Sequence, residues 1–250
     1  MRKFAIFCLA SSLAHGAPAL RRPDMSAEEF WQQPEVNARI DIATFDRPLM
    51  ATAIFHEANR VRGELGLPLF RHMPKLDDAA DLEAGMGRVY QPPSHTNPFP
   101  MIGTPLERVK FVGLVPQLVA ENIALLSIYD IDPNLGVGVV AYEGKKHFVN
   151  PDSQAELKPA TYRGFAAEVV KAWMESPGHR MVLINPALLY LGCSVQPSVS
   201  VLGVDNLFCV QVFFTPGNKV SDHQREKPGL GEAESRPFDR RLHGAAQTER

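Results

Sequence analysis

Apolar residues at helical spacing predict two helices in the first half of the chain. The first covers about residues 48–65, and the second covers about 75–90. Gly85 and Gly87 each weaken the second helix by about 1 kcal/mol, so we expect them to pack closely against another element. Prolines between 91 and 103 exclude a helix there, and Thr104-Pro105-Leu106-Glu107 is typical of a helix start.

The second half of the chain combines strands with one further helix. Alternation over 135–149 predicts a hairpin that turns at 143–145, and 161–175 has an amphipathic helical pattern. Two apolar runs, 189–195 and 207–214, are typical of antiparallel strands. This order of elements predicts an α+β fold in which helices pack on both sides of an antiparallel sheet.

The two ends of the chain differ from the middle. Arg2 and Lys3 precede an apolar run over 4–14 with small residues at its end, which predicts a signal peptide over 1–19 and a secreted or periplasmic protein. This run is too short to span a bilayer, and no later stretch is long and apolar enough to do so. We interpret 20–45 as an N-terminal extension that lies over the domain, 46–218 as the domain, and 219–250 as a disordered tail.

Charge and cysteine content narrow the classes of function. Charged residues make up 22% of the 250 residues, and the formal net charge is -2, so nothing indicates nucleic acid or an anionic membrane surface as a partner. Cleavage of the signal peptide would remove Cys8 and leave Cys193 and Cys209. We expect these two to form a cross-strand disulfide worth about 3 kcal/mol; the alternative is two buried thiols.

Three titratable residues stand where secondary structure alone does not require them. His95 lies in the proline-rich loop, Glu121 lies inside the apolar run 118–128, and His179 follows the turn Ser176-Pro177-Gly178 at an expected helix start. A carboxylate in an apolar run is either buried with polar partners or placed on the wall of a pocket.

Five sequence blocks, in order between 48 and 218, resemble the CAP superfamily of cysteine-rich secretory proteins, venom antigens and plant pathogenesis-related proteins, in particular its bacterial SCP-like branch. The blocks are Asn59, Arg62, Gly66, Leu67 and Leu69; Ser94-His95-Thr96 with Gly103, Glu107-Arg108 and Gly113; Ala120-Glu121-Asn122-Ile123-Ala124; Trp173-Met174 and Ser176-Pro177-Gly178-His179-Arg180 with Ile184, Pro186 and Gly192; and Phe214-Thr215-Pro216-Gly217-Asn218.

The resemblance implies the CAP fold, an α-β-α sandwich with a central open cavity that two histidines and two acidic residues line. His95, Glu121 and His179 match three of these positions. At the fourth, animal and plant members have a glutamate, whereas this chain has Ser176. Glu175 precedes it by one residue, about 100° around the helix, and does not substitute for it. The difference argues against a mechanism that needs four titratable groups.

The sequence leaves three uses of this ligand cavity open. His95 and His179, with Glu121, could bind Zn²⁺ or another divalent cation and keep one position for water. Glu121 could activate water in a metal-assisted, peptidase-like hydrolase, with Ser176 a weaker catalytic candidate because no third group orients His179. The favoured hypothesis is non-enzymatic binding of an extracellular peptide, lipid or metal. The three side chains could also merely bond to one another and tie the loop to the helix.

Overall fold

The computed structural model describes residues 23–88, 93–132, 134–199 and 203–217. All of them fall in one compact unit that ends at Gly217. The predicted signal peptide and the predicted tail therefore lie outside the described residues. The helices are α1 (Ala27–Trp31), α2 (Arg47–Glu64), α3 (Pro74–Gly87), α4 (Pro105–Phe111), α5 (Tyr162–Glu175) and α6 (Pro177–Leu183), with 3-10 turns at Pro34–Asn37 and Ile42–Thr44.

A four-stranded sheet forms the middle layer, with the strand order β1-β5-β6-β2. The strands are β1 (Arg71–His72), β2 (Pro116–Ser127), β5 (Tyr190–Val199) and β6 (Asp205–Pro216). β6 pairs antiparallel with both β2 and β5, whereas β1 pairs parallel with β5. The expectation of an antiparallel sheet is therefore correct for its three long strands, and the short β1 makes the sheet mixed.

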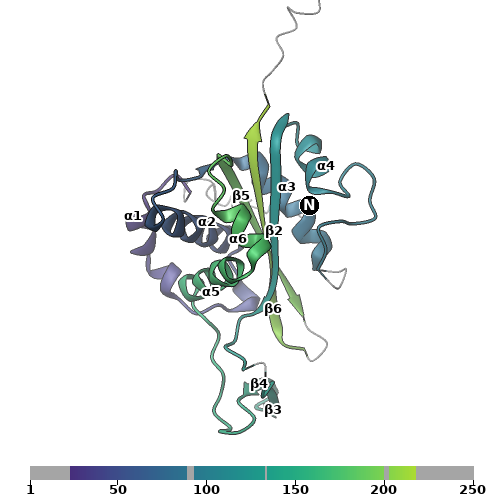
Figure 1. The fold of residues 1–250 in the computed structure, drawn as a ribbon. Helices are drawn as coiled ribbons and strands as arrows, with labels where there is room; N and C mark the ends of the chain where they lie inside the picture. Colours follow the sequence, from purple (N-terminus) through teal and green to yellow (C-terminus); the bar gives the residue numbers. More distant parts are fainter. Residues whose placement is uncertain (1–22, 89–92, 133, 200–202, 218–250) are drawn as a thin grey trace, which may run out of the picture. The chain divides into compact units, whose positions relative to one another are not determined.

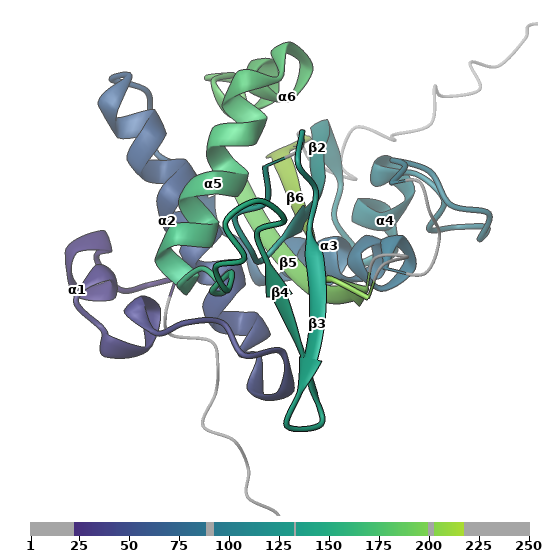
Figure 2. The ribbon, with the colours of Figure 1, turned by 90° about the horizontal axis from the view of Figure 1, so that it is seen from below.

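Helices cover both faces of this sheet, as the sequence predicted. Figures 1 and 2 show α2 and α5 on one side and α3 and α4 on the other. Two clusters of buried side chains fill the two interfaces: one joins Phe55, Val169 and Phe213, and the other joins Ala80, Ile123 and Phe208. The described unit is thus an α-β-α sandwich, and successive residues of a central strand face different cores.

The sequence pattern did not predict β2, although this strand carries Glu121. Its residues alternate poorly between apolar and polar, because both faces of the strand are covered by helices. A strand covered on both faces reads as a nearly continuous apolar run, which periodicity alone does not distinguish from a helix. By contrast, the hairpin of β3 (Gly138–Tyr142) and β4 (Lys145–Val149) turns at Glu143 and Gly144 as predicted.

Only one of the two glycines expected to pack closely does so. A Cβ on Gly87 would lie 2.1 Å from a ring carbon of Phe208 on β6, so α3 approaches the sheet through this residue. No heavy atom lies within 4 Å of a Cβ built on Gly85, and the prediction was wrong there. Thr104 caps α4 as expected: its hydroxyl accepts a hydrogen bond from the Glu107 amide.

The expected disulfide is absent, since Cys193 and Cys209 are both free and buried. Cys193 stands opposite Gln211, and Cys209 stands opposite Val195, so the register offsets the two cysteines by two residues. Diagonal neighbours in a sheet are about 7–8 Å apart, too far for the Cβ separation of about 3.8 Å in a disulfide. Burial raises the pKa of both thiols, which makes them poor nucleophiles.

The described part of the N-terminal extension packs on the α2 and α5 side of the unit. Ser26 and Glu29 form a capping box at the start of α1. Phe30 is fully buried and stacks on His56 of α2, with ring centroids 4.5 Å apart. Among the described helices, none is both long and apolar enough to cross a membrane.

Candidate functional site

The candidate site surrounds β2, which is an edge strand of the sheet. Side chains on a strand point alternately to its two faces, so Glu121 and Asn122 act on opposite sides of β2. Glu121 bonds to Arg108 of α4 on one side. On the other side, Asn122 Nδ2 donates to the backbone oxygen of His179 on α6, at 3.3 Å. The two adjacent residues thereby hold two segments that are far apart in the sequence.

Glu121 also orients the imidazole of His95. The His95 Nδ1 atom lies 3.0 Å from Glu121 Oε1. The His95 side chain is 46% exposed, whereas that of Glu121 is 1% exposed. The bond thus joins a buried carboxylate to a ring that solvent reaches. The hydrogen bond to Glu121 raises the pKa of His95, which favours its protonated form.

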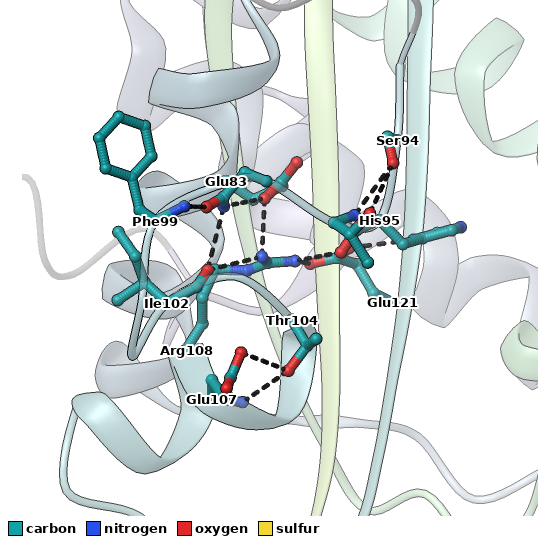
Figure 3. A network of polar contacts seen from close by, with 11 residues as sticks. Glu83, Ser94, His95, Phe99, Ile102, Thr104, Glu107, Arg108 and Glu121 are labelled. Atoms are coloured by element: carbon teal, nitrogen blue, oxygen red, sulfur yellow. Dashed lines mark hydrogen bonds and ion pairs between the residues drawn. The ribbon is translucent and has the colours of Figure 1, made fainter.

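Behind this pair lies a buried charge network that the sequence had not revealed. Arg108 Nη2 lies 2.7 Å from Glu121 Oε2, and Arg108 Nη1 lies 2.8 Å from Glu83 Oε2 (Figure 3). The three side chains come from α4, β2 and α3, and each is at most 2% exposed. One positively charged guanidinium stands between two carboxylates, which leaves an excess negative charge when both are ionised. A proton on His95 would neutralise this excess. Burial raises the pKa of Glu83; the Arg108 charge opposes this rise, and the neighbouring Glu121 carboxylate adds to it.

The same arginine holds the loop that carries His95. Its guanidinium donates to the backbone oxygens of Ile102, at 3.0 Å, and His95, at 3.3 Å. Asn97 Nδ2 donates both to Glu83 Oε2 and to the Ile102 oxygen. A Cβ on Gly103 would lie 3.0 Å from the Asn97 oxygen, so a side chain there would press against the backbone of the loop. The buried network therefore fixes the backbone of the His95 loop as well as its side chain.

His179 reaches the same place from the other side of β2. It lies near the start of α6, where its ring is partly buried. The ring centroids of His95 and His179 are 6.4 Å apart, with their planes at 52°. Burial, followed by the charge of His95, lowers the pKa of His179. The two imidazoles therefore differ: one favours the protonated form and its neighbour the neutral form.

Ser176 and Glu175 do not complete a fourth titratable position. Ser176 is the N-cap of α6, but its side chain makes no capping hydrogen bond, and within the described structure it makes none to His179. Glu175 is exposed at the end of α5. The structure thus brings together His95, Glu121 and His179, and leaves Ser176 at the margin without a partner that would activate it.

The hydrogen bonds of Glu121 limit which side chains could act as ligands of a metal ion at this site. Both carboxylate oxygens of Glu121 already accept hydrogen bonds, one from His95 and one from Arg108. Within the described ranges, no group of three or more His, Cys, Asp or Glu side chains is arranged to hold a metal ion. Two imidazoles remain, and the bond from His95 Nδ1 to Glu121 leaves Nε2 to face a ligand. This is the arrangement in which a carboxylate orients a metal-binding histidine from behind.

Two network residues lacked an assigned role at the sequence level. Glu83 falls on the apolar face of α3 with Leu76 and Ala80, and a carboxylate in that stripe was a sign of a buried partner. Arg108 belonged to one of the family-like blocks, but its spacing alone does not reveal what it contacts.

Comparison with protein families gives a match over part of the chain. Residues 116–213 match the model of the CAP family, described as the cysteine-rich secretory protein family. These residues run from β2 through α5 and α6 to β6, and they include Glu121 and His179.

The chain is therefore similar to the CAP family over residues 116–213.

His95, Glu83 and Arg108 precede the matched segment, so the match itself covers only part of the site.

Several solved structures of bacterial proteins match the chain at low identity and with low TM-scores. An extracellular protein of Bacillus anthracis that contains an SCP domain is 21% identical, with a TM-score of 0.41; the match covers 67% of this chain and 41% of that protein. An outer surface protein of Borrelia burgdorferi is 18% identical over 72% of this chain and 99% of its own, with a TM-score of 0.42. The CAP domain of enterococcal PrgA is 12% identical, with a TM-score of 0.41; the match covers 82% of this chain and 86% of that domain. No curated protein sequence matches the chain.

Proposed function

We propose that this CAP-domain protein is exported and binds an extracellular ligand, without catalysing a reaction, at the site formed by His95, His179 and Glu121. The carrying observation is that two imidazoles held on opposite sides of an edge strand converge to 6.4 Å. The ligand would be a divalent metal ion, a peptide or a lipid. The basic and apolar start of the sequence supports export.

The bonding of Glu121 supports binding over hydrolysis. A general base must be free to take a proton from water, whereas both Glu121 oxygens are engaged and the side chain is buried. The cysteine thiols are buried as well, and Ser176 has no hydrogen bond to His179 in the described structure. In this proposal Glu121 is a positioning residue, and the metal-assisted hydrolase is the alternative that the experiments must exclude.

The two partly exposed imidazoles offer two modes of binding. Neutral imidazoles would bind a divalent ion such as Zn²⁺, with water or ligand atoms as the remaining donors. A protonated His95 would instead pair with an anionic group, such as a peptide carboxylate or a lipid phosphate. The raised pKa of His95 beside the lowered pKa of His179 supports a site that can hold one positive charge.

A zinc titration of the purified chain tests the metal mode. Loss of either imidazole, in His95→Ala or His179→Ala, should weaken Zn²⁺ binding by about tenfold or more. His147→Ala is the matched control, since His147 lies on the hairpin and bonds to Glu156. If both site variants retain the metal content of the wild type, the metal mode is wrong.

Two further measurements test the remaining ligands and the absence of catalysis. Mass spectrometry of small molecules that co-purify with wild type but not with the double variant of His95 and His179 would identify a peptide or lipid. A screen of peptide and ester substrates addresses hydrolysis directly. Turnover by the wild type that Glu121→Gln abolishes would overturn the non-enzymatic proposal.

A further inference from the structure

A cavity of about 350 Å³ lies at the opposite edge of the sheet from the histidine site. Residues of α2, β1, α3 and β5 line it. It exists because β1 is short: β1 pairs only with Tyr190 and Leu191, and β5 continues past it to Val199. The edge of β5 around Cys193 and Val195 therefore has no neighbouring strand, and the space between α2 and α3 remains open there.

The lining of this cavity is apolar at the sheet and helix α2 and acidic along α3. Phe55, Ala51 and Val195 contribute apolar surface. Pockets of this volume with mostly apolar walls and a few polar groups are typical of sites for small organic ligands. Burial of apolar ligand surface in such a pocket favours binding.

The polar groups of the cavity carry an excess of negative charge. Asp77, Asp78 and Asp81 all line it from α3, against the single guanidinium of Arg47. His72 is the remaining ionisable side chain of the lining apart from the buried Cys193 thiol.

Hydrogen bonds and ion pairs hold the side chains of two of these aspartates, whereas that of Asp78 is exposed. Asp77 Oδ2 lies 2.6 Å from His72 Nε2, and its Oδ1 accepts the Cys193 amide at 2.9 Å. Asp81 accepts from Arg47 and Ser194. Asp78 is exposed, and none of the hydrogen bonds or ion pairs found among the described residues involves its side chain. Asp78 is therefore the carboxylate best placed to receive a charge from outside.

We infer that this cavity is a second binding site, separate from the histidine site, for a small organic cation: an amine carried on an apolar or aromatic body. The apolar body fits against Phe55 and Val195, and the ammonium group pairs with Asp78 at the acidic wall. An uncharged analogue of the same shape leaves this excess negative charge uncompensated, so the charge determines the class of ligand. None of the cavity residues belongs to the proposed ligand site of His95 and His179.

Isothermal titration calorimetry of the full chain with tryptamine tests this inference, with tryptophol as the uncharged analogue of the same shape. We expect saturable binding of tryptamine and affinity for tryptophol weaker by about tenfold or more. Ala51→Phe fills the cavity without changing its charge and should abolish binding. Asp78→Asn should weaken tryptamine binding several-fold, whereas Asp152→Asn, the same change on an exposed acid elsewhere, should leave it unchanged.

The outcome also distinguishes this inference from the proposed function. The inference is overturned if tryptamine does not bind the wild type, or if a folded Ala51→Phe protein binds it as tightly as the wild type. It is also overturned if binding is lost in His95→Ala and retained in Ala51→Phe.

Discussion

Two regions of this molecule place one arginine between two glutamates, in opposite surroundings. On α2, Arg60 contacts Glu57 and Glu64 within one helix, and the Arg60 side chain is 46% exposed. In the sandwich interior, Arg108 contacts Glu83 and Glu121, and its side chain is fully buried. The bond distances are similar, since Arg60 Nη2 lies 2.6 Å from Glu57 and Arg108 Nη2 lies 2.7 Å from Glu121.

The comparison teaches that the surroundings of an ion pair determine its role. The Arg60 group bonds residues that are already neighbours on one helix, so it adds little to the tertiary structure. The Arg108 group joins three elements and the backbone of the His95 loop. Its charges are removed from water, so each becomes costly as soon as its partner is lost. Only this group can connect the stability of the fold to the geometry of the site.

The largest expected effect comes from removing each arginine. Arg108→Met should lower the free energy of unfolding by about 3–5 kcal/mol, because two carboxylates remain buried without their partner. Arg60→Met should cost less than Arg108→Met, because Arg60 is half exposed and only one of its two partners, Glu57, is buried. Urea denaturation of both variants measures the difference, and equal losses would contradict the contrast drawn here.

A smaller effect is expected in the coupling energies of the two groups. A double-mutant cycle of Arg108→Met with Glu121→Gln should give a coupling of about 0.5–3 kcal/mol. The matching cycle of Arg60→Met with Glu64→Gln should give about 0.3–0.5 kcal/mol, the value of an exposed helical pair. The same denaturation experiments supply both cycles. A coupling near zero at Arg108 would show that the guanidinium acts through packing alone.

The pH dependence should separate the two groups further. The folded chain raises the pKa of His95 above the unfolded value of about 6.5, chiefly through its bond to Glu121. The stabilisation that protonated His95 gives the folded state is therefore fully present below about pH 6.5. It is lost as the pH rises through the raised pKa. From about pH 6 to about pH 8, the free energy of unfolding should therefore fall more in the wild type than in His95→Gln. Denaturation curves at the two pH values measure this difference.

The control for this pH experiment is His147→Gln, which keeps the Glu121 network intact. Because guanidinium groups stay protonated across this pH range, the Arg60 group should contribute nothing to the difference. Wild type and His95→Gln profiles that run parallel would remove His95 from the charge balance of the buried network.

The smallest effect should come from salt. At about 1 M ionic strength the screening length falls to roughly 3 Å. The coupling of Arg60 with Glu64 should then fall by a few tenths of a kcal/mol, whereas the coupling of Arg108 with Glu121 should not change measurably. Repeating both cycles in 1 M NaCl checks this, and a salt-sensitive Arg108 coupling would mean that water reaches the network.

Much of the fold could be predicted from local patterns, and the failures have specific causes. Helix α4 began where Thr104 and Pro105 indicated, because capping depends on a few adjacent residues. Strand β2 was not predicted, because coverage on both faces removes the alternation that marks a strand. The disulfide was wrong because strand register, which sets which residues are opposite, is a property of the paired sheet.

For the candidate site, too, the sequence revealed the residues, and only the structure revealed their contacts. His95, Glu121 and His179 were recognisable as residues, because polar groups in a loop, an apolar run and a tight turn stand out from their neighbours in the chain. That Glu121 orients His95 while Asn122 holds the His179 backbone follows from the edge position of β2 and from the alternation of its side chains. The partnership of Arg108 with Glu83 depended on the packing of α3, α4 and β2. Charge pairing across elements arises only when folding brings distant residues together in a space that excludes water.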